Sequence, residues 1–466
     1  MPRLAWFTPL PPVRSGVAQY NVELLPGLTS EYQIDLFVDG HPGRFVGPDA
    51  GTPVYSAHDF VWKHVQRPYD LTVYQLGNAP CHDYMWAYLV RYPGLVVLHD
   101  GQLHHARARW LLKQRRADDY RSEFRFNHPG AEVDVAEVGI AGLLGSLTYL
   151  WPMRRVIVES ARLVVVHSPW LAGQLREEHP NARINVVEMG VPAPDVRDGA
   201  GAMVRARHGL PAEATLFAAF GKVTPEKRIS QAIRGLASIA ESAPNVHLLL
   251  AGEQVDYYDP RVEARKLGLA DRVTIAGFVP PDEMSAYLSA ADVCLCMRWP
   301  STRETSAAWL RCLAAGRPTI ITDLIHTVDI PALDPRSWTL LHAPSISADE
   351  IMPGPAEPAC VSVDILDEDH SLVLAMRRLA ADHRLRATLG QSARKLWLER
   401  FTLERMVSGY RDAIEAACAA PLPGSATRIR LPGHFLTDGT EHTAQLLREM
   451  GLPDSRIAEI WQSVTP

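Results

Sequence analysis

The sequence lacks the features expected of a membrane-spanning, secreted or zinc-binding chain. Its longest nearly apolar stretch, residues 139–153, is shorter than the ~20 residues that cross a bilayer, and it contains a proline. The six cysteines are scattered, and no CxxC or Cys/His ligand spacing occurs. The N-terminal segment MPRLAWFTPLPP is too rich in proline for a signal peptide. We therefore expect no transmembrane helix, no zinc site and free thiols in a reducing, cytoplasmic compartment.

The sequence also lacks the basic excess of a general nucleic-acid-binding protein. Its 47 Lys and Arg residues are outnumbered by 53 Asp and Glu residues, for a net charge of -6, whereas contacts to phosphates need a basic face. We therefore expect no nucleic-acid partner. No GxGxxG motif follows the first apolar run, which disfavours an NAD-dependent dehydrogenase. The 466 residues, 47% of them hydrophobic, are enough for two globular α/β domains.

Short apolar runs alternate along the chain with longer stretches of helical spacing, which is the pattern of parallel βαβ units. Two sets of six runs predict an α/β protein with two doubly wound, Rossmann-like sheets. The predicted strands are residues 4–8, 34–38, 71–75, 95–99, 163–167 and 184–188 in the first half, and 215–220, 246–251, 273–276, 293–296, 319–322 and 338–342 in the second.

The domain boundaries are predicted from changes in composition. Residues 190–211 are rich in Pro, Gly and Ala and suit an interdomain linker. We therefore predict one Rossmann-like domain over residues 1–195 and a second over 196–400. A helix over 401–420 is expected to return to the first domain, and residues 421–466 form an extension with a short helix near 441–450.

The segment that follows the predicted strand 215–220 carries two lysines. Gly221 permits a tight turn, and Lys222 and Lys227 precede a stretch with helical apolar spacing. Ligands of open α/β sheets bind beyond the carboxyl ends of the strands. Two ammonium groups beside a helix start can clamp a diphosphate. Taken alone, the same residues would form a solvated loop with two surface lysines.

A second polar segment follows the predicted strand 293–296. We expect a helix to start at Ser301 and to carry Glu304 in its first turn. A carboxylate there can bind sugar hydroxyls, while Thr305, Ser306 and nearby backbone N–H groups face a phosphate. In the alternative interpretation, Ser301 and Glu304 form a capping box and Glu304 only satisfies a backbone N–H group. The spacing does not choose between the two.

These segments form part of an ordered set that resembles family 4 of the glycosyltransferases over roughly residues 1–418. The set contains SGVAQY near the start, HD after the fourth predicted strand, VHS after the fifth, the Gly221–Lys227 loop, GFVPPDEMSAYLSAADV, and PSTRE followed by AAGRPTIITD. The resemblance implies a GT-B fold with an N-terminal acceptor domain and a C-terminal donor domain that face a central cleft. It also implies a hexosyltransferase that retains the anomeric configuration and takes a GDP- or UDP-sugar as donor substrate. From the residues themselves we expect no required cofactor or metal.

The resemblance also implies the roles of single residues. Lys222 and Lys227 would hold the departing diphosphate, and Lys222 stands where the family usually has Arg, so the charge is kept and the bidentate fork is lost. Glu304 and His99 would hold the donor sugar. The family's second glutamate, which contacts the nucleotide ribose, is missing. Counting forward from Glu304 to its expected position reaches Cys312, and counting back from the Ala-Gly-x-Pro turn reaches Arg311. Further donor-binding residues would be Ser15, Gly16, Gly221, Glu253, Phe278, Thr305 and Ser306.

Other polar segments are less specific. The Asp367–Glu368–Asp369 run has a D-x-D form, but we interpret it as a helix N-cap and not as a metal site. The basic stretch 107–116 suits either a peripheral contact with the inner face of a membrane or an acceptor pocket or solvated helix. Residues on the acceptor side of the first domain are Gln75, Gly77, Asn78, His82, His104, His105, Arg107 and Arg109.

The acceptor is left open between a glycan, a lipid-linked molecule and a small molecule. Rival interpretations are a GT-B nucleotide-sugar epimerase or phosphorylase, and a non-catalytic nucleotide-sugar binding protein, the latter suggested by the missing second glutamate.

Overall fold

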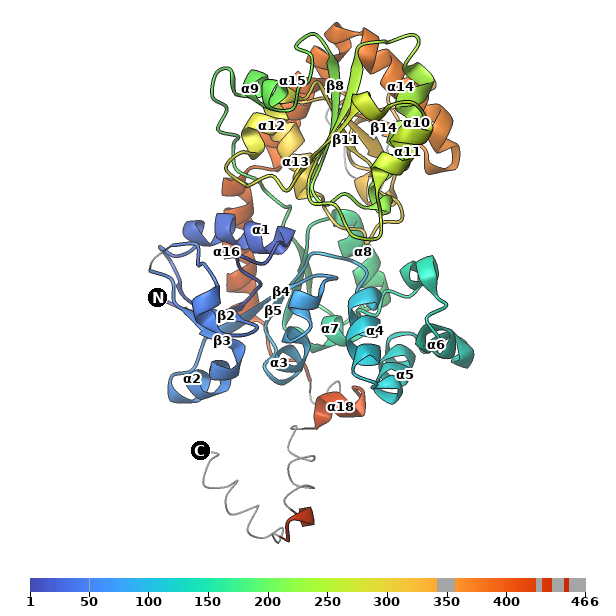
Figure 1. Cartoon of the computed structure of the whole chain (residues 1–466). Helices are drawn as coiled ribbons and strands as arrows, with labels where there is room; N and C mark the ends of the chain where they lie inside the picture. Colours follow the sequence, from blue (N-terminus) through green and yellow to red (C-terminus); the bar gives the residue numbers. More distant parts are fainter. Residues whose placement is uncertain (50, 342–356, 425–429, 438–447, 452–466) are drawn as a thin grey trace. The chain divides into compact units, whose positions relative to one another are not determined.

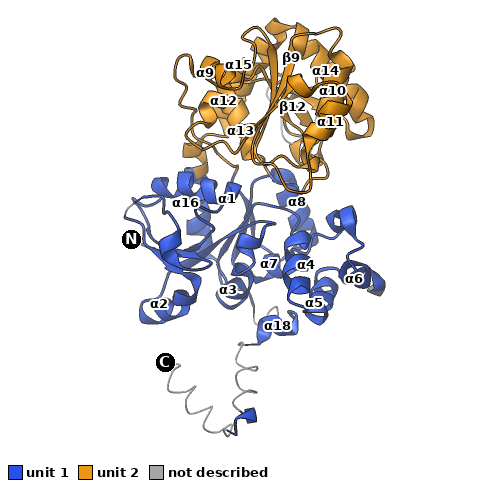
Figure 2. Ribbon diagram, viewed as in Figure 1, with its two compact units in different colours: residues 1–187, 302–304, 407–466 blue, residues 188–301, 305–406 orange. Residues whose placement is uncertain are grey.

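The computed structural model describes residues 1–49, 51–341, 357–424, 430–437 and 448–451 (Figure 1). Contacts divide the chain into two compact units, coloured separately in Figure 2. Unit 1 comprises Met1–Val187, Thr302–Glu304 and Val407–Pro466, and unit 2 comprises Glu188–Ser301 and Thr305–Met406. Each unit is built on its own parallel sheet. Among the described residues, no helix is long and apolar enough to cross a bilayer.

The sheet of unit 1 has seven parallel strands in the order β3-β2-β1-β4-β5-β6-β7. Its central strands are continuous runs of Val and Leu buried on both faces, as parallel sheets require. All six strands expected in this half are present, and the short, half-buried β3 at the edge was not predicted. The strands are β1 (Arg3–Phe7), β2 (Gln33–Val38), β3 (Val54–Ser56), β4 (Leu71–Leu76), β5 (Leu95–Leu98), β6 (Leu163–Val166) and β7 (Ile184–Val186).

Helices cover both faces of this sheet. Helices α2, α3, α7 and α8 pack on one face around Phe7, Phe37 and Phe60. On the other face, Trp6 donates to Asn21 of α1 and stacks on Tyr410 of α16. The helices are α1 (Gly16–Leu24), α2 (Phe60–Gln66), α3 (Met85–Arg91), α4 (His104–Lys113), α5 (Ala117–Asn127), α6 (Val133–Ile140), α7 (Arg155–Ser160), α8 (Pro169–Glu178), α16 (Leu403–Ala419) and α18 (Gly433–Leu436), with 3-10 turns η1 (Leu25–Gly27), η2 (Pro42–Arg44), η3 (Ala57–Asp59), η4 (Pro80–His82) and η5 (Gly145–Leu150).

Unit 2 repeats the architecture with the strand order β10-β9-β8-β11-β12-β14-β13. One face of the sheet carries α10 and α14, and the other carries α9, α12 and α13. The strands are β8 (Thr215–Phe220), β9 (Val246–Ala251), β10 (Val273–Gly277), β11 (Val293–Cys296), β12 (Thr319–Thr322), β13 (Ala332–Leu333) and β14 (Cys360–Val363). The helices are α9 (Ala200–Arg207), α10 (Ile229–Ile239), α11 (Pro260–Lys266), α12 (Met284–Ala290), α13 (Ala307–Ala314), α14 (Glu368–Ala381) and α15 (His383–Arg400). The 3-10 turns are η6 (Pro225–Lys227), η7 (Ala270–Arg272), η8 (Ile325–Thr327) and η9 (Ile365–Asp367).

Three details differ from the sequence-based expectations. Residues 338–341 are not a strand, because Trp338 has a positive φ of 58° and only Leu340 forms an isolated bridge. β13 and β14 occupy the edge of the sheet instead. The segment 190–211 is not a bare linker, because it contains α9, which packs on α12. The first change of unit falls at Glu188 and not near residue 195. Most of the predicted helix at 441–450 lies outside the described residues.

Candidate active site

The strand order of unit 2 reverses between β8 and β11, which marks the crevice where ligands of open α/β sheets bind. Gly221, directly after β8, has a φ of +83°, which favours glycine. The Lys227 Nζ atom donates to the carbonyl oxygen of Phe220, the last residue of β8. A Cβ atom on Gly221 would lie 2.7 Å from that Nζ atom. The fold therefore holds the Lys227 ammonium group at the carboxyl end of β8, over a glycine that leaves room for it.

The ends of β8 and β9 are in close contact. A Cβ atom on Gly252 would lie 2.0 Å from the carbonyl oxygen of Gly221, and Val223 N donates to the Glu253 carbonyl oxygen at 2.8 Å. Lys222 is exposed in the same loop. The structure thus brings Gly221, Lys222, Lys227 and Glu253 together. Phe278 follows β10, the strand beyond β9, and its side chain is exposed. That these residues bind a donor stays a prediction.

One functional feature of this loop was missed by the sequence analysis. Arg228 adopts a φ of +59° at the start of α10, a conformation that costs energy for a residue with a side chain. Its guanidinium group forms a forked ion pair with the buried carboxylate of Glu368, with Nε 2.7 Å from Oε1. The pair ties the end of the lysine loop to α14. No sequence signal marks it, because the two residues are far apart in the chain.

The ion pair also explains the Asp367–Glu368–Asp369 run. Asp367 stands at the N-cap position of α14, but it makes no cap bond and instead accepts from Ser371 Oγ at 3.1 Å. Glu368 is engaged with Arg228. Within the described ranges, no group of three His, Cys, Asp or Glu side chains is placed to hold a metal ion.

The predicted capping box at Ser301 and Glu304 is wrong. Helix α13 begins only at Ala307, and its cap is Ser306, whose Oγ atom accepts from Trp309 N at 3.3 Å. The residue that caps α13 is thus Ser306 and not Ser301. The Ser-x-x-Glu pattern favours the earlier start, but Arg303 has a φ of 60°, which is incompatible with an α-helix at this point.

Residues Thr302–Glu304 belong to unit 1. The Thr302 Oγ1 atom lies 2.7 Å from Asp100 Oδ1 and 2.6 Å from Glu304 Oε2, and the Thr302 carbonyl accepts from Gly101 N at 2.8 Å. Because a hydroxyl carries one proton, it can donate to only one of the two carboxylates at a time. The structure therefore brings the predicted sugar-binding Glu304 beside Asp100, the residue after His99.

His99 lies in a chain of buried hydrogen bonds. Its Nε2 atom is 2.7 Å from Gln75 Oε1, its Nδ1 atom is 3.1 Å from His167 Nε2, and His167 Nδ1 is 2.8 Å from the Val187 carbonyl oxygen. Both ring nitrogens of His99 are thus occupied. A direct hydrogen bond from His99 to a sugar would require one of these contacts to break, so its sugar-binding role stays a prediction.

The remaining acceptor-side residues form structural contacts. His82 Nδ1 contacts the Gln75 carbonyl, and Asn78 Oδ1 accepts from Ala106 N. His104 pairs with Tyr120, and His105 pairs with Thr148. Gly77 lies against His82 and Asp100.

Part of the basic stretch 107–116 is buried, and its contact with a membrane stays a prediction. Arg107 is buried in an ion pair with Glu123, and Leu111 belongs to the core. Arg109 is exposed.

The predicted glycine loop of unit 1 begins α1 beyond the end of β1, where the strand order of this sheet reverses between β1 and β4. Ser15 is the cap of α1, and its Oγ atom accepts from Val17 N at 3.2 Å. No atom lies within 4 Å of a Cβ placed on Gly16, so space alone would admit a larger residue there.

Comparison with known proteins is consistent with this geometry. Residues 214–337 match the family model of the group 1 glycosyl transferases. The chain is 31% identical over 130 residues to 2-deoxystreptamine glucosyltransferase of Streptomyces kanamyceticus, covering 27% of this chain and 33% of that protein. It is 26% identical over 285 residues to D-inositol 3-phosphate glycosyltransferase of Segniliparus rotundus, covering 58% of this chain and 56% of that protein. The chain therefore spans between a third and about three fifths of the length of these relatives.

Solved structures share the whole two-unit fold. Sucrose-phosphate synthase from Thermosynechococcus elongatus superposes with a TM-score of 0.58 at 19% identity, and the HepE protein of Anabaena in complex with UDP and glucose superposes with a TM-score of 0.58 at 14% identity. Each match covers 89% of this chain and 100% of the other. The fold is therefore GT-B, as the sequence predicted.

Proposed function

We propose that this chain, whose residues 214–337 match the family model of the group 1 glycosyl transferases, is a retaining hexosyltransferase that moves a sugar from a nucleotide diphosphate donor to an acceptor. The observation that carries the proposal is the end of β8. There Lys227 is fixed over Gly221, Lys222 is exposed nearby, and α10 begins directly afterwards. In this proposal the two ammonium groups neutralise the diphosphate as its bond to the sugar breaks.

Charge on the leaving diphosphate is the main quantity that such a site has to stabilise. In a retaining transfer, the acceptor hydroxyl attacks the face from which the diphosphate leaves, and a phosphate oxygen takes the hydroxyl proton. The new bond joins the acceptor oxygen to the anomeric carbon, and the nucleotide diphosphate departs with the bonding electrons. We assign Glu304 and His99 to the donor sugar, supported by the proximity of Glu304 to Asp100.

We propose no required cofactor or metal, and UDP- and GDP-sugars as the donors to test first. UDP is supported by the HepE protein of Anabaena, whose structure is a complex with UDP and glucose. Two relatives carry 2-deoxystreptamine and D-inositol 3-phosphate in their names. These names support a small polyhydroxylated acceptor over a lipid-linked one. A cytoplasmic location is part of the proposal, supported by the six free thiols.

A two-stage experiment tests the function. First, thermal unfolding is measured with UDP, GDP and their glucose and mannose conjugates, because a ligand that binds the folded state raises the melting temperature. Second, the nucleotide sugar that gives the largest rise is incubated alone, and released nucleotide and recovered sugar are measured. Slow release of nucleotide is the expected result. Epimerised donor would instead identify an epimerase, and tight binding with no release under any acceptor would identify a binding protein.

A further inference from the structure

Unit 1 contains a cavity of about 710 Å³ that the donor site does not use. Its walls come from the end of α5, from η5, from α7 and α8, and from Arg303. This volume is within the range of pockets that hold small ligands. We call it the α5–α8 pocket.

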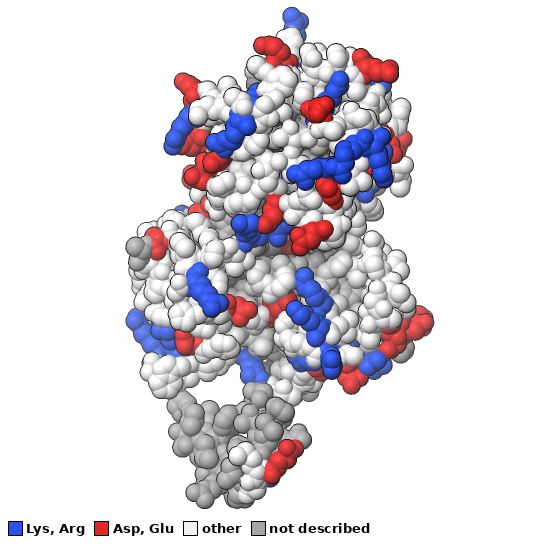
Figure 3. All heavy atoms as spheres, in the orientation of Figure 1, with Lys and Arg blue, Asp and Glu red and all other residues white. Residues whose placement is uncertain are grey.

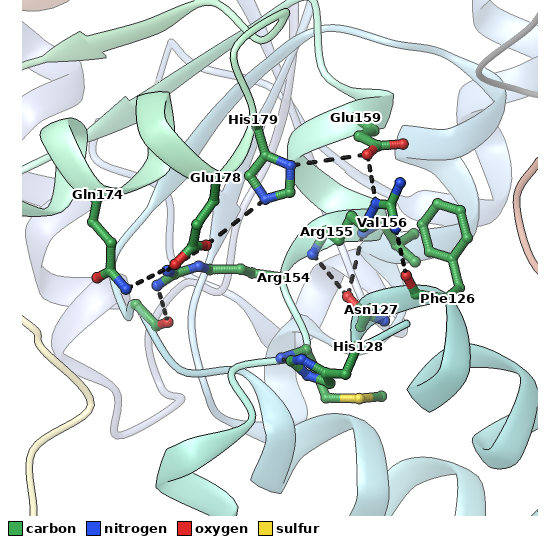
Figure 4. Close-up of polar contacts among 12 residues, drawn as sticks. Phe126, Asn127, His128, Arg154, Arg155, Val156, Glu159, Gln174, Glu178 and His179 are labelled. Atoms are coloured by element: carbon green, nitrogen blue, oxygen red, sulfur yellow. Dashed lines mark hydrogen bonds and ion pairs between the residues drawn. The ribbon is translucent and has the colours of Figure 1, made fainter. Parts of the chain in front are cut away.

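Two ion pairs form the polar wall of the α5–α8 pocket (Figure 4). Arg154, whose side chain is 1% exposed, donates from Nη2 to both oxygens of Glu178 at 2.8 and 2.7 Å. Arg155 donates from Nε to Glu159 Oε1 at 2.6 Å. The ring of His179 lies between the pairs, 3.8 Å from Glu159 and 3.9 Å from Glu178. Each guanidinium group is thus held rigidly beside a carboxylate.

The two pairs are anchored to the backbone around them. Arg154 Nη1 donates to the Gly101 carbonyl at 3.0 Å, and Arg155 Nη1 donates to the Phe126 carbonyl at 3.1 Å. Asn127 Oδ1 accepts from the Arg155 backbone N–H at 2.7 Å, which fixes the start of α7. The polar wall is therefore preorganised, and ligand binding would not cost the conformational entropy of ordering these side chains.

The ionisable groups around the pocket nearly balance. Burial lowers the pKa of His128 to about 4 and also lowers the pKa of His179, so both rings are neutral near pH 7. Burial alone would raise the pKa of Glu178, but the hydrogen bonds and charge of Arg154 outweigh it, and the pKa lies below its usual value. Two carboxylates therefore offset two of the three guanidinium groups. The third, Arg303, donates to Gln174 Oε1 at 2.5 Å and lies over the Trp170 ring.

The pocket also has aromatic and apolar lining residues. Tyr149, Leu150 and Trp151 are among them, and Leu150 is 66% exposed. A sugar or polyol combines hydroxyls, each both a donor and an acceptor, with apolar C–H faces, so it matches both the ion pairs and these apolar residues. A phosphate or carboxylate group brings acceptors only, and the guanidinium groups of Arg154 and Arg155 already donate to Glu178 and Glu159.

We propose that the α5–α8 pocket binds a neutral polyhydroxylated molecule, a sugar or polyol, and that this molecule is the acceptor. The second half of the statement rests on the proposed function. It is supported by the chain path within unit 1, because Gln102 of the pocket belongs to the segment that begins with His99 and Asp100. Arg303 of the pocket directly precedes Glu304. The two segments that carry the residues assigned to the donor sugar thus also line the pocket.

Binding is tested by saturation-transfer NMR on the full chain, with glucose, maltose and myo-inositol as neutral probes and glucose 6-phosphate and inorganic phosphate as anionic ones. The expected result is binding of neutral probes, with glucose at least as tight as glucose 6-phosphate. Two variants map the site. Glu159→Gln removes one carboxylate, and Gly130→Trp fills the mouth, where no atom lies within 4 Å of an added Cβ. Each should weaken neutral binding by about tenfold or more, the scale of a lost charge-assisted hydrogen bond.

Ala141→Trp is the matched control, because Ala141 is exposed on the same segment outside the pocket. It should bind the probes as the wild type does. No neutral binding, or neutral binding that both pocket variants leave unchanged, would overturn the site. Tighter binding of glucose 6-phosphate than of glucose would overturn the ligand class. UDP and GDP titrations of the wild type test the proposed function separately, since the proposed lysine clamp, Lys222 and Lys227, does not line this pocket.

Discussion

His99 Nδ1 and His167 Nε2 lie 3.1 Å apart in a chain of hydrogen-bond contacts. The chain ends at Gln75 Oε1 on one side and at the Val187 carbonyl oxygen on the other. The chain has three contacts: Gln75 with His99, His99 with His167, and His167 with the Val187 carbonyl. Each contact needs one proton, but two neutral imidazoles carry only two. Burial lowers the pKa of His99 well below its usual range and the pKa of His167 to about 4, so a charged ring is disfavoured. A turned Gln75 amide would supply the third proton and direct its oxygen to Tyr410, whose hydroxyl lies near that amide.

The buried histidines of unit 1 predict that its stability falls as the pH is lowered from 7 to 5. Burial gives His82, His128 and His167 pKa values of about 4 in the folded state, below the ~6.5 of an unfolded chain. Between these pKa values the unfolded state therefore binds more protons than the folded state. The free energy of unfolding falls as the pH falls. The two buried rings, His82 and His167, should each contribute about 2 kcal/mol of this loss by pH 5.

Urea unfolding at pH 7 and pH 5 measures the effect. His167→Gln should reduce the difference between the two pH values by its own share of about 2 kcal/mol. His370→Gln, on an exposed part of α14, serves as the control and should leave the difference as in the wild type. Equal pH dependence in His167→Gln and the wild type would show that His167 does not titrate as its burial demands.

Lys227→Ala should reduce kcat/KM for the donor by about 10² to 10³, because removing one donor to developing charge typically costs that much. The Lys227 ammonium group caps the last carbonyl of β8, so only a modest loss of stability is expected alongside. Steady-state kinetics and thermal melts check both effects. Lys266→Ala, exposed at the end of α11, controls for the loss of one positive charge from the unit. A Lys227→Ala protein that keeps half of its activity would remove the clamp role.

Gly221→Ala should be more harmful to activity than its backbone strain alone explains. The φ of +83° penalises any side chain by roughly 1–2 kcal/mol, and the new methyl group would also displace Lys227 Nζ. Gly209→Ala is the matched control, because Gly209 has a φ of +63° and no atom within 4 Å of an added Cβ. Similar melting temperatures with activity lost only in Gly221→Ala are expected. Equal activity in the two variants would mean that the position of Lys227 is not set by Gly221.

The strands were predictable from sequence because most are continuous apolar runs buried on both faces. β14 was missed because its CVSV sequence is short and carries Ser362 and Cys360, and β3 was missed because it is a half-buried edge strand. Some candidate site residues were predictable from the positions of the strands. Strand-end residues such as Gly221 and His99 could be selected from their position after an apolar run.

What the sequence could not show are contacts between residues far apart in the chain. Arg228 and Glu368 are separated by 140 positions, and nothing in either segment announces the other. The α5–α8 pocket is likewise assembled from the ends of several helices and from Arg303. Local spacing also misled at Glu304, where a capping-box pattern occurs in a loop, because the tertiary contact of Thr302 with Asp100 overrides the local preference.

Glu304→Gln should lower the transfer rate by about 10² or more while the melting temperature stays close to that of the wild type. The amide keeps an oxygen that can accept from Thr302, and the cap of α13 is Ser306, so no helix end is disturbed. Donor-saturated turnover and a thermal melt separate the two effects. Glu177→Gln, exposed on α8, is the charge control. A large drop in melting temperature would show that Glu304 is a structural residue, and unchanged turnover would remove it from the sugar site.

Arg228 and Glu368 should show strong energetic coupling, because either side chain alone leaves a largely buried charge without its partner. Arg228→Gly removes the guanidinium group and also relieves the strain of a φ of +59°, whereas Glu368→Gln keeps the shape of the side chain. The double variant should therefore be more stable than the sum of the two single effects predicts, by roughly 1–3 kcal/mol. Urea unfolding of the four proteins measures this coupling, and donor KM in the same set shows whether the pair also positions Lys227. Additive stabilities would mean that the pair is not a structural anchor, and an unchanged donor KM would mean that the lysine loop holds its geometry without it.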